Sequence, residues 1–170
     1  FASLVDDTTV HSVVITGEGR AFCSGGDVHD IIGALLDQSE EETLAFTRLT
    51  GELIGNMRQL PKPIVAAVNG LAAGAGAVIA LAADLRVVSS DASFAFLFTQ
   101  VGLTGADMGA GYLLPRVVGS GRASELLLIG DPIDAETADR YGLVTRLVAQ
   151  EDCLPGAMDL ATKLAKGPLA

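Results

Sequence analysis

Two glycine-rich loops carry the groups in this sequence that are best suited to hold a developing negative charge. The first loop starts at Gly17 and Gly19, and the second contains Gly74, Ala75 and Gly76. Each follows an apolar run that predicts a buried strand, and small residues let backbone N–H groups approach a ligand closely. The second loop also opens a predicted helix, whose unpaired N–H groups and positive dipole end favour an anion. The loops could therefore form an oxyanion hole, although isolated glycines could equally serve tight packing of strand against helix.

Other chemistries that use glycine-rich loops fit this sequence poorly. Phe22 and Ile79 stand where the two loops would need the third glycine of a dinucleotide fingerprint, and no GxxxxGK[ST] motif occurs. Ser24 lacks the glycine two residues earlier that a nucleophile elbow requires, which argues against a serine hydrolase. His11 and His29 lie apart with no third ligand at metal spacing, so we expect no metal site.

Asp107 is an acidic residue whose surroundings suit proton transfer. It lies in the segment Gly-Ala-Asp-Met-Gly at 105–109, where small and apolar neighbours would shield its carboxylate from water. It also directly precedes a predicted helix over 108–114, and aspartate is a favoured N-cap residue. The sequence therefore supports a general acid/base and a helix cap about equally, and the two roles are compatible.

Short apolar runs alternate with stretches of helical spacing along the chain. The continuous apolar run at 64–68 is typical of a strand buried on both faces. Ser39 and Glu42 have the spacing of a capping box, and the helix that they would start should end before Pro61. This alternation predicts an α/β fold with mostly parallel strands and helices on the outside. The expected strands cover 10–17, 64–68, 85–88, 93–96 and 142–148, and the expected helices cover two parts of 28–60, then 75–83, 109–114, 122–128, 134–141 and the chain from about 154.

Composition narrows the functional classes. The 170 residues suit one domain, and 49% hydrophobic residues are enough for a sizeable core. A net charge of -10 repels nucleic-acid backbones and anionic lipid surfaces, so we expect neither as a partner. Asn69 and several glycines interrupt the uncharged stretch 64–83, which favours strand, turn and helix over a membrane span. Cys23 and Cys153 lie far apart without CxxC spacing, which favours a reducing, cytoplasmic setting.

Several ordered blocks resemble those of the crotonase (enoyl-CoA hydratase/isomerase) superfamily. The resemblance covers nearly the whole chain, and blocks in the right order are more specific than any one of them. It implies a spiral of ββα turns that binds acyl-CoA thioesters and stabilises an enolate. The matching blocks are GRAFCSGGDV at 19–28, PKPIVAAVNG at 61–70 with AGAG at 73–76 and AD at 83–84, FTQVGL at 98–103, LPRVVG at 114–119, ASELLLIG at 123–130 and residues 138–144.

The resemblance assigns roles to the loops. Family members place their oxyanion-hole amides at the positions of Gly26 and Ala75. The loop that usually wraps the adenine end of coenzyme A matches Ser24, Gly25, Gly26, Asp27 and Val28. Coenzyme A would thus be part of the substrate, and no tightly bound cofactor is implied. The family usually forms homotrimers or dimers of trimers; we expect residues 1–170 to be one core domain without the family's N-terminal strand and C-terminal helical trimerisation segment.

The departures from the family pattern bear on the reaction. Hydratases of this family use two glutamates, and this chain has Val78 and Phe98 at those positions, neither of which can transfer a proton. Asp107 matches the aspartate of dienoyl-CoA isomerases, with one extra residue after Gly102, and also the nucleophilic aspartate of 4-chlorobenzoyl-CoA dehalogenase. We expect isomerase-type proton transfer. The alternatives are a hydrolase or dehalogenase with Asp107 as nucleophile, a hydratase with a non-standard site, or a member that only binds CoA thioesters.

The remaining side chains receive pocket or structural roles. Phe98 and Tyr112 are expected to help shape the acyl pocket, with Tyr112 largely buried. Asp84 and Arg86 are expected to pair at the start of a strand, and Lys62 is expected to be solvated, although a CoA phosphate nearby would favour such a cation.

Overall fold

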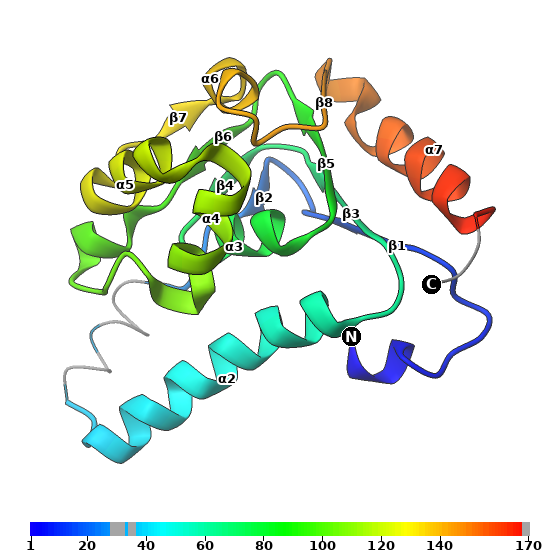
Figure 1. The fold of residues 1–170 in the computed structure, drawn as a ribbon. Helices are drawn as coiled ribbons and strands as arrows, with labels where there is room; N and C mark the ends of the chain where they lie inside the picture. The colour runs from blue at the N-terminus through cyan, green and yellow to red at the C-terminus, as the bar shows by residue number, and fades with distance from the viewer. Residues whose placement is uncertain (28–32, 34–36, 168–170) are drawn as a thin grey trace.

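The first six strands of the chain alternate between two four-stranded sheets, the seventh joins the second sheet and the eighth joins the first (Figure 1). The computed structural model describes residues 1–27, 33 and 37–167. All neighbouring strands are parallel except β6 and β7. The first sheet has the order β1 (Val13–Thr16), β3 (Ile64–Val68), β5 (Leu85–Ser89), β8 (Arg146–Val148), and the second has the order β2 (Ala21–Cys23), β4 (Leu71–Ala73), β6 (Ser93–Ala95), β7 (Ile133–Asp134).

Helices follow the strand pairs, so the chain winds as a spiral of strand, strand and helix. This confirms the predicted α/β class with mostly parallel strands. Among the described residues no helix combines the length and the apolar character needed to cross a bilayer. The helices are α2 (Glu40–Gln59), α3 (Ala75–Ala82), α4 (Ala110–Val118), α5 (Ser120–Ile129), α6 (Ala135–Arg140) and α7 (Cys153–Ala165), with 3-10 turns η1 (Ala2–Leu4), η3 (Leu97–Val101), η4 (Asp107–Gly109) and η5 (Gln150–Asp152).

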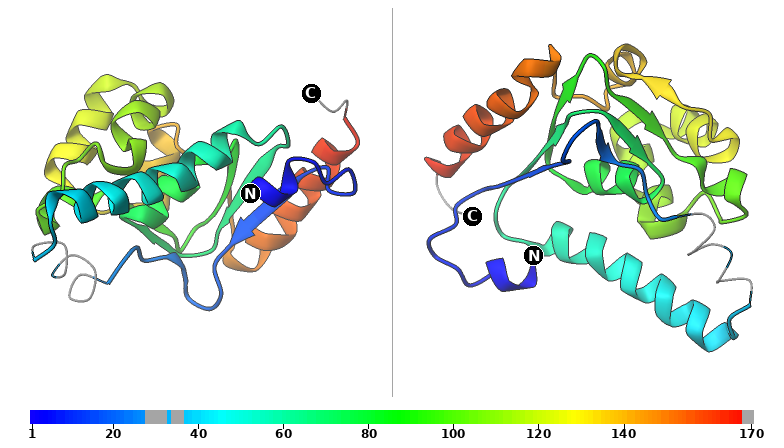
Figure 2. Two further views of the ribbon diagram at one scale, coloured as in Figure 1. Left: turned by 90° about the horizontal axis from the view of Figure 1, so that it is seen from below. Right: turned by 180° about the vertical axis from the view of Figure 1, so that it is seen from behind.

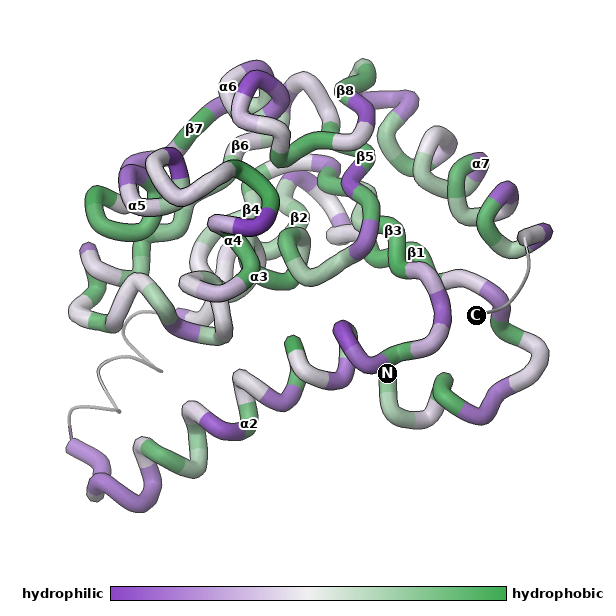
Figure 3. The backbone as a smooth tube through the Cα atoms, viewed as in Figure 1, coloured by the Kyte–Doolittle hydropathy of each residue, from purple (hydrophilic) through white to green (hydrophobic). Residues whose placement is uncertain are grey.

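Strand β3 is apolar along its whole length because both of its faces are covered. Val65 and Ala67 pack with residues of α7, which lies along the outer face of the first sheet (Figure 2). Ile64, Ala66 and Val68 face the larger core on the other side, where α3 lies. Alternate side chains of a strand point to opposite faces, so a strand between two layers needs apolar residues at every position. The hydropathy of the tube in Figure 3 shows this run of hydrophobic residues.

Helix α2 has the start and the end that its sequence predicts. The Ser39 Oγ accepts from the Glu42 N–H at 3.3 Å, and the Glu42 Oε2 accepts from the Ser39 N–H at 2.9 Å. This capping box holds the pKa of the Glu42 carboxyl below its usual range. Hydrophobic and hydrophilic residues alternate around the helix in Figure 3. The other helix expected between 28 and 60 lies largely outside the described residues.

Three strands of the second sheet lie where the sequence predicts loops or turns. Strands β2 and β4 fall within the glycine-rich segments, and β7 precedes α6. They contain only three, three and two residues, which is too short for an alternating pattern to emerge. Helix α4 also continues to Val118 beyond its expected end at 114, with Pro115 inside it.

Arg86 anchors the C-terminal end of α3 and does not form the expected ion pair with Asp84. Its guanidinium is buried and donates to the carbonyl oxygens of Ala83 at 2.7 Å and Leu143 at 2.7 Å, with longer bonds to those of Ala80 and Leu81. Burial lowers the pKa of Arg86, while the nearby Asp84 raises it. The carbonyls of Ala80, Leu81 and Ala83 lie at the C-terminal end of α3, where the helix leaves them without partners, so a buried cation can satisfy them.

Two neighbouring charged residues also differ from expectation. Asp84 pairs with Arg58 at 3.0 Å and accepts from the Ile64 N–H at 2.8 Å, which ties the end of α2 to the start of β3. Lys62 is 9% exposed and not solvated. Its ammonium donates to the carbonyl oxygens of Leu4 and Asp7, which fixes the N-terminal segment against the loop before β3.

Candidate active site

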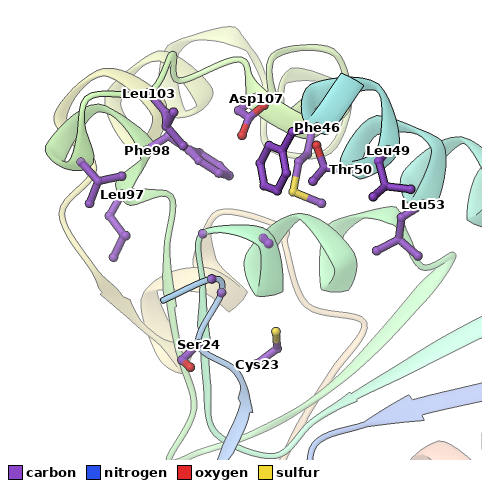
Figure 4. Close-up of a pocket in the computed structure, with 16 residues that line it drawn as sticks. Cys23, Ser24, Phe46, Leu49, Thr50, Leu53, Leu97, Phe98, Leu103 and Asp107 are labelled. Atoms are coloured by element: carbon purple, nitrogen blue, oxygen red, sulfur yellow. The ribbon is translucent and has the colours of Figure 1, made fainter. Parts of the chain in front are cut away.

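A cavity of about 490 Å³ opens where the two glycine-rich loops meet α2 and the turns η3 and η4 (Figure 4). Its walls are almost entirely apolar side chains and backbone. The lining residues are Cys23, Ser24, Gly25, Gly26, Phe46, Leu49, Thr50, Leu53, Gly74, Ala75, Leu97, Phe98, Val101, Leu103, Asp107 and Met108.

The first loop passes directly against the start of α3. Gly25 has φ +85°, and a Cβ there would lie 3.0 Å from the Ala73 carbonyl oxygen and 3.5 Å from the Ala75 nitrogen. A side chain at this position would thus be strained by the backbone conformation and crowded by the second loop. This approach brings Gly26 and Ala75 to the same cavity.

The second loop presents the positive end of a helix to the cavity. Gly74 has φ +52° and ψ −119°, and its N–H donates to the Ala95 carbonyl oxygen at 2.8 Å. Ala75 is the first residue of α3, where a backbone N–H has no partner within the helix. The helix dipole adds a partial positive charge at this point, so the site favours a developing oxyanion.

Asp107 lies on the opposite side of the cavity, beside the rings of Phe46 and Phe98 in Figure 4. It is half-buried and belongs to η4, and it is not the N-cap of a helix. Met108 has a left-handed φ of 51°, which separates Asp107 from α4. Helix α4 is instead capped by Gly109 without a side-chain bond, so the capping interpretation of Asp107 is wrong.

Of the two aromatic residues expected in the acyl pocket, Phe98 lines the cavity and Tyr112 does not. Phe98 is 4% exposed and lines the cavity. Tyr112 is 62% exposed, is absent from the lining, and stacks on the Arg116 guanidinium at 3.5 Å. Helix α4 buries Ala110 and Leu114, which are four residues apart and share one face, so Tyr112 falls on the other face. The expectation that Tyr112 is buried is therefore wrong.

Comparison with known proteins agrees with this architecture. The family model for enoyl-CoA hydratase/isomerase matches residues 1–170. A crystal structure from Streptomyces coelicolor A3(2), described as a candidate enoyl-CoA hydratase, is 51% identical with a TM-score of 0.95, over 99% of this chain and 61% of that one. The probable enoyl-CoA hydratase EchA12 of Mycobacterium tuberculosis is 42% identical over 163 residues, covering 94% of this chain and 57% of EchA12. The 1,2-epoxyphenylacetyl-CoA isomerase of Escherichia coli K12 is 37% identical over 162 residues, covering 95% of this chain and 62% of that protein.

The chain belongs to the enoyl-CoA hydratase/isomerase family. The predicted resemblance to the crotonase superfamily is thereby confirmed. The chain spans about 60% of the length of these relatives, between 57% and 62%.

In this enoyl-CoA hydratase/isomerase family member, the two positions expected for hydratase glutamates hold no proton-transfer group. Val78 is fully buried in α3, and Phe98 contributes a ring to the cavity wall. Among the described residues that line the cavity, Asp107 is the only one with a carboxylate. The described residues also include no cluster of three or more His, Cys, Asp or Glu residues arranged to hold a metal ion.

The loop expected to contact coenzyme A is only partly covered by the structure. Ser24, Gly25 and Gly26 line the cavity, and Asp27 is exposed outside the lining. Val28 lies outside the described residues.

One wall of the cavity, formed by α2, is not predicted from the sequence. Phe46, Leu49, Thr50 and Leu53 all come from α2, at spacings of three and four residues that place them on one face of the helix. The helical pattern of these residues is visible in the sequence, but nothing in it indicates whether that face covers the core or borders a cavity. Leu49 is 66% exposed, so this wall lies at an open side of the cavity.

Proposed function

We propose that this protein binds an acyl-CoA thioester and moves a proton on its acyl group through an enolate. The N–H groups of Gly26 and Ala75 would stabilise the negative charge, and Asp107 would carry the proton. One observation supports this above all: three residues from segments far apart in sequence line a single apolar cavity.

The chemistry needs only these groups. The Asp107 carboxylate takes a proton from the carbon next to the thioester carbonyl, and the electrons of the C–H bond move onto the carbonyl oxygen. The two N–H groups bind that oxyanion in surroundings of low polarity, where such interactions are stronger than in water. Asp107 then returns the proton to another carbon, the double bond shifts, and the carbonyl forms again. No atom or electron is gained or lost.

The composition of the cavity favours isomerisation over hydration. Addition of water by the usual route would use a second carboxylate, and Val78 and Phe98 occupy the positions expected for the glutamates. Isomerisation can proceed with one base that accepts and returns the proton. The Escherichia coli relative named as a 1,2-epoxyphenylacetyl-CoA isomerase is consistent with this choice.

Coenzyme A would bind as part of the substrate along residues 24–28, and the whole protein would act as a homotrimer or a dimer of trimers. Both proposals rest on family membership. The cavity lining formed by Ser24, Gly25 and Gly26 is consistent with the first.

A nucleophilic role for Asp107 is the second candidate. The carboxylate is half-buried, lies at the cavity and does not cap a helix, so it could attack an electrophilic carbon of the acyl group. Attack on a halogen-bearing ring carbon would expel the halide and form an aryl ester of Asp107, whereas attack on the thioester carbonyl would expel the CoA thiolate and form a mixed anhydride. Mass spectrometry of the protein after brief mixing with haloaryl-CoA and acyl-CoA substrates would detect either adduct.

The decisive experiment follows exchange of α-protons with deuterium from solvent in a panel of CoA thioesters, together with calorimetric binding. We expect Asp107→Asn to slow exchange about 100- to 10,000-fold, the range for loss of a general base. The control Asp91→Asn, in the exposed turn after β5, should behave as the parent protein. Binding without exchange in the parent would contradict enolate chemistry, and equal exchange in Asp107→Asn would contradict the role of this residue.

A further inference from the structure

The side chain of Asn69 uses all of its hydrogen-bonding groups on one short segment of chain. Its Oδ1 accepts from the Gly17 N–H at 3.1 Å and from the Thr16 hydroxyl at 3.4 Å. Its Nδ2 donates to the carbonyl oxygens of Gly19 at 3.1 Å and Ala21 at 3.4 Å. A primary amide offers two donors and two acceptor lone pairs, so both donors and one lone pair are used here, and the second lone pair shares the Thr16 hydroxyl proton with the Ala67 carbonyl oxygen at 3.0 Å.

These hydrogen bonds from the Asn69 side chain lie where the pairing of β2 with β4 is irregular. Strands β2 and β4 pair through Ala21 opposite Leu71 and Cys23 opposite Ala72, with a shift of register between the two pairs. A bulge of this kind leaves backbone groups unpaired and weakens the definition of the register. Asn69 lies two residues before β4 and holds the residue that begins β2, so its bonds fix the relative position of these strands where the ladder does not.

The two proposed oxyanion amides follow from the opposite ends of the same two strands. Gly26 lies three residues after the end of β2, and Ala75 lies two residues after the end of β4. A displacement of β2 along β4 would therefore change the separation of the two N–H groups. Rates depend steeply on this geometry, since a misplacement of about 1 Å can cost about 100-fold.

The backbone around Asn69 is itself held in place. Gly70 passes so close to the first loop that a Cβ would lie 2.1 Å from the Arg20 carbonyl oxygen. The Asn69 carbonyl oxygen accepts from the Gln150 Nε2 at 3.0 Å, and the Gln150 Oε1 accepts from the buried Ser89 hydroxyl. The backbone at Asn69 is thus linked through Gln150 to β5 in the first sheet as well as to the loop that Asn69 holds.

We propose that Asn69 is a positioning residue for the oxyanion hole: by fixing β2 against β4 it sets the distance between the Gly26 and Ala75 N–H groups. The inference rests on the proposed function, because it concerns the same site. It assigns to Asn69 an effect on the transition state that a purely structural hydrogen bond would not have.

The test compares the full chain with three variants. Asn69→Ala removes all four side-chain bonds, and Asn69→Asp keeps the acceptors while losing both donors to Gly19 and Ala21. Ser12→Ala is the control, since it removes a bond of 3.0 Å to the Ala161 carbonyl oxygen in the packing of α7, away from the cavity. The probe is phenylacetyl-CoA labelled with ¹³C at the thioester carbonyl, which has exchangeable α-protons and no double bond to move.

Two readouts separate positioning from stability. The infrared stretching frequency of the bound labelled carbonyl reports its polarisation, and deuterium exchange gives kcat and KM for proton removal. In the parent we expect a lowered carbonyl frequency. In both Asn69 variants we expect that frequency to return toward the value of the free thioester, and kcat to fall about 10- to 100-fold with KM changed less than about threefold. Ser12→Ala should match the parent in both.

The outcomes distinguish this inference from the function on which it rests. If the parent neither binds the probe nor exchanges its protons, the proposed function fails and this inference with it. If the parent does both and the Asn69 variants keep its frequency and kcat, the positioning role is wrong while the function stands. Failure of both Asn69 variants to fold would also overturn it, because the role would then be one of stability.

Discussion

Gly76 in the first turn of α3 passes so close to Cys23 in β2 that a Cβ on Gly76 would lie 2.0 Å from the Cys23 carbonyl oxygen. No real Cβ contact is this short, so any side chain must push the helix away from the strand. The first turn of α3 includes Ala75, and the loop after β2 includes Gly26. The contact therefore sets how closely the two proposed oxyanion amides can approach.

Gly76→Ala is expected to lower the free energy of unfolding by about 1–3 kcal/mol, the usual cost of an overpacked contact, and to slow α-proton exchange. Chemical denaturation and deuterium exchange measure the two effects. Gly51→Ala in α2 is the matched control, because a Cβ there meets nothing within 4 Å. Alanine in a helix interior should stabilise by about 0.5–1 kcal/mol. Equal stability of the two variants would show that the contact with Cys23 yields easily.

Leu53→Ala is expected to weaken binding of bulky acyl-CoA thioesters by about 3- to 10-fold, because the lost side chain buries only part of its surface in the cavity. Binding of acetyl-CoA, which has no bulky acyl group, should change little. Calorimetric titration with both ligands measures the difference. Leu44→Ala on the same helix changes the same residue type at 49% exposure, against 36% for Leu53, and Leu44 does not line the cavity. A comparable loss in Leu44→Ala would mean that α2 affects binding through the stability of the helix.

The fold is predictable from sequence where burial acts on whole segments. Strand β3 is apolar at every position because α7 and the larger core cover its two faces, and that pattern is visible in the residues themselves. Helix α2 carries its own start signal in Ser39 and Glu42. Strands β2 and β4 contain three residues each, and their pairing depends on Asn69 and on glycines that approach other segments. Such contacts join parts of the chain about 50 residues apart, and no local pattern encodes them.

The candidate site is likewise predictable from the sequence only in part. Gly26, Ala75 and Asp107 could be selected from residue type and family resemblance, and all three line the cavity. The capping interpretation of Asp107 was wrong because the left-handed φ of Met108 delays the helix until Ala110, a conformation uncommon for a residue other than glycine. The general tendency of tyrosine rings to be buried predicts that Tyr112 lies inside, and this prediction is wrong. The exposure of Tyr112 follows from the rotation of α4, which tertiary packing decides.

Asp134→Ala is expected to lower the melting temperature at pH 7, and this difference should shrink as the pH falls below about 4. The Asp134 carboxylate accepts from the Thr137 N–H at 2.7 Å at the start of α6, and the hydroxyl and N–H of Thr137 hold the pKa of Asp134 below its usual value. A lowered pKa in the folded state gives a stabilisation that is present above the usual pKa and lost as the pH falls through the lowered one. Thermal melts from pH 2 to 7 measure this dependence.

Asp134→Asn is the control for this cap, since asparagine also caps helices but does not titrate. It should keep most of the melting temperature at pH 7 and remove the contribution of this site to the pH dependence. If Asp134→Ala destabilised the protein equally at every pH, the carboxylate would not be responsible for the effect.

The two cysteines are expected to react with a small thiol reagent at very different rates. Cys153 is 1% exposed, its Sγ lies 3.5 Å from the Val87 carbonyl oxygen, and burial raises the pKa of its thiol, so it should react only on unfolding. Cys23 is half-buried and lines the cavity, so it should react in the folded protein, and a bound CoA thioester should slow that reaction. The absorbance of the leaving group that the reagent releases measures both rates. Cys23→Ser should remove the fast reaction. A fast reaction unaffected by saturating CoA thioester would place the ligand away from Cys23 and would count against binding in this cavity.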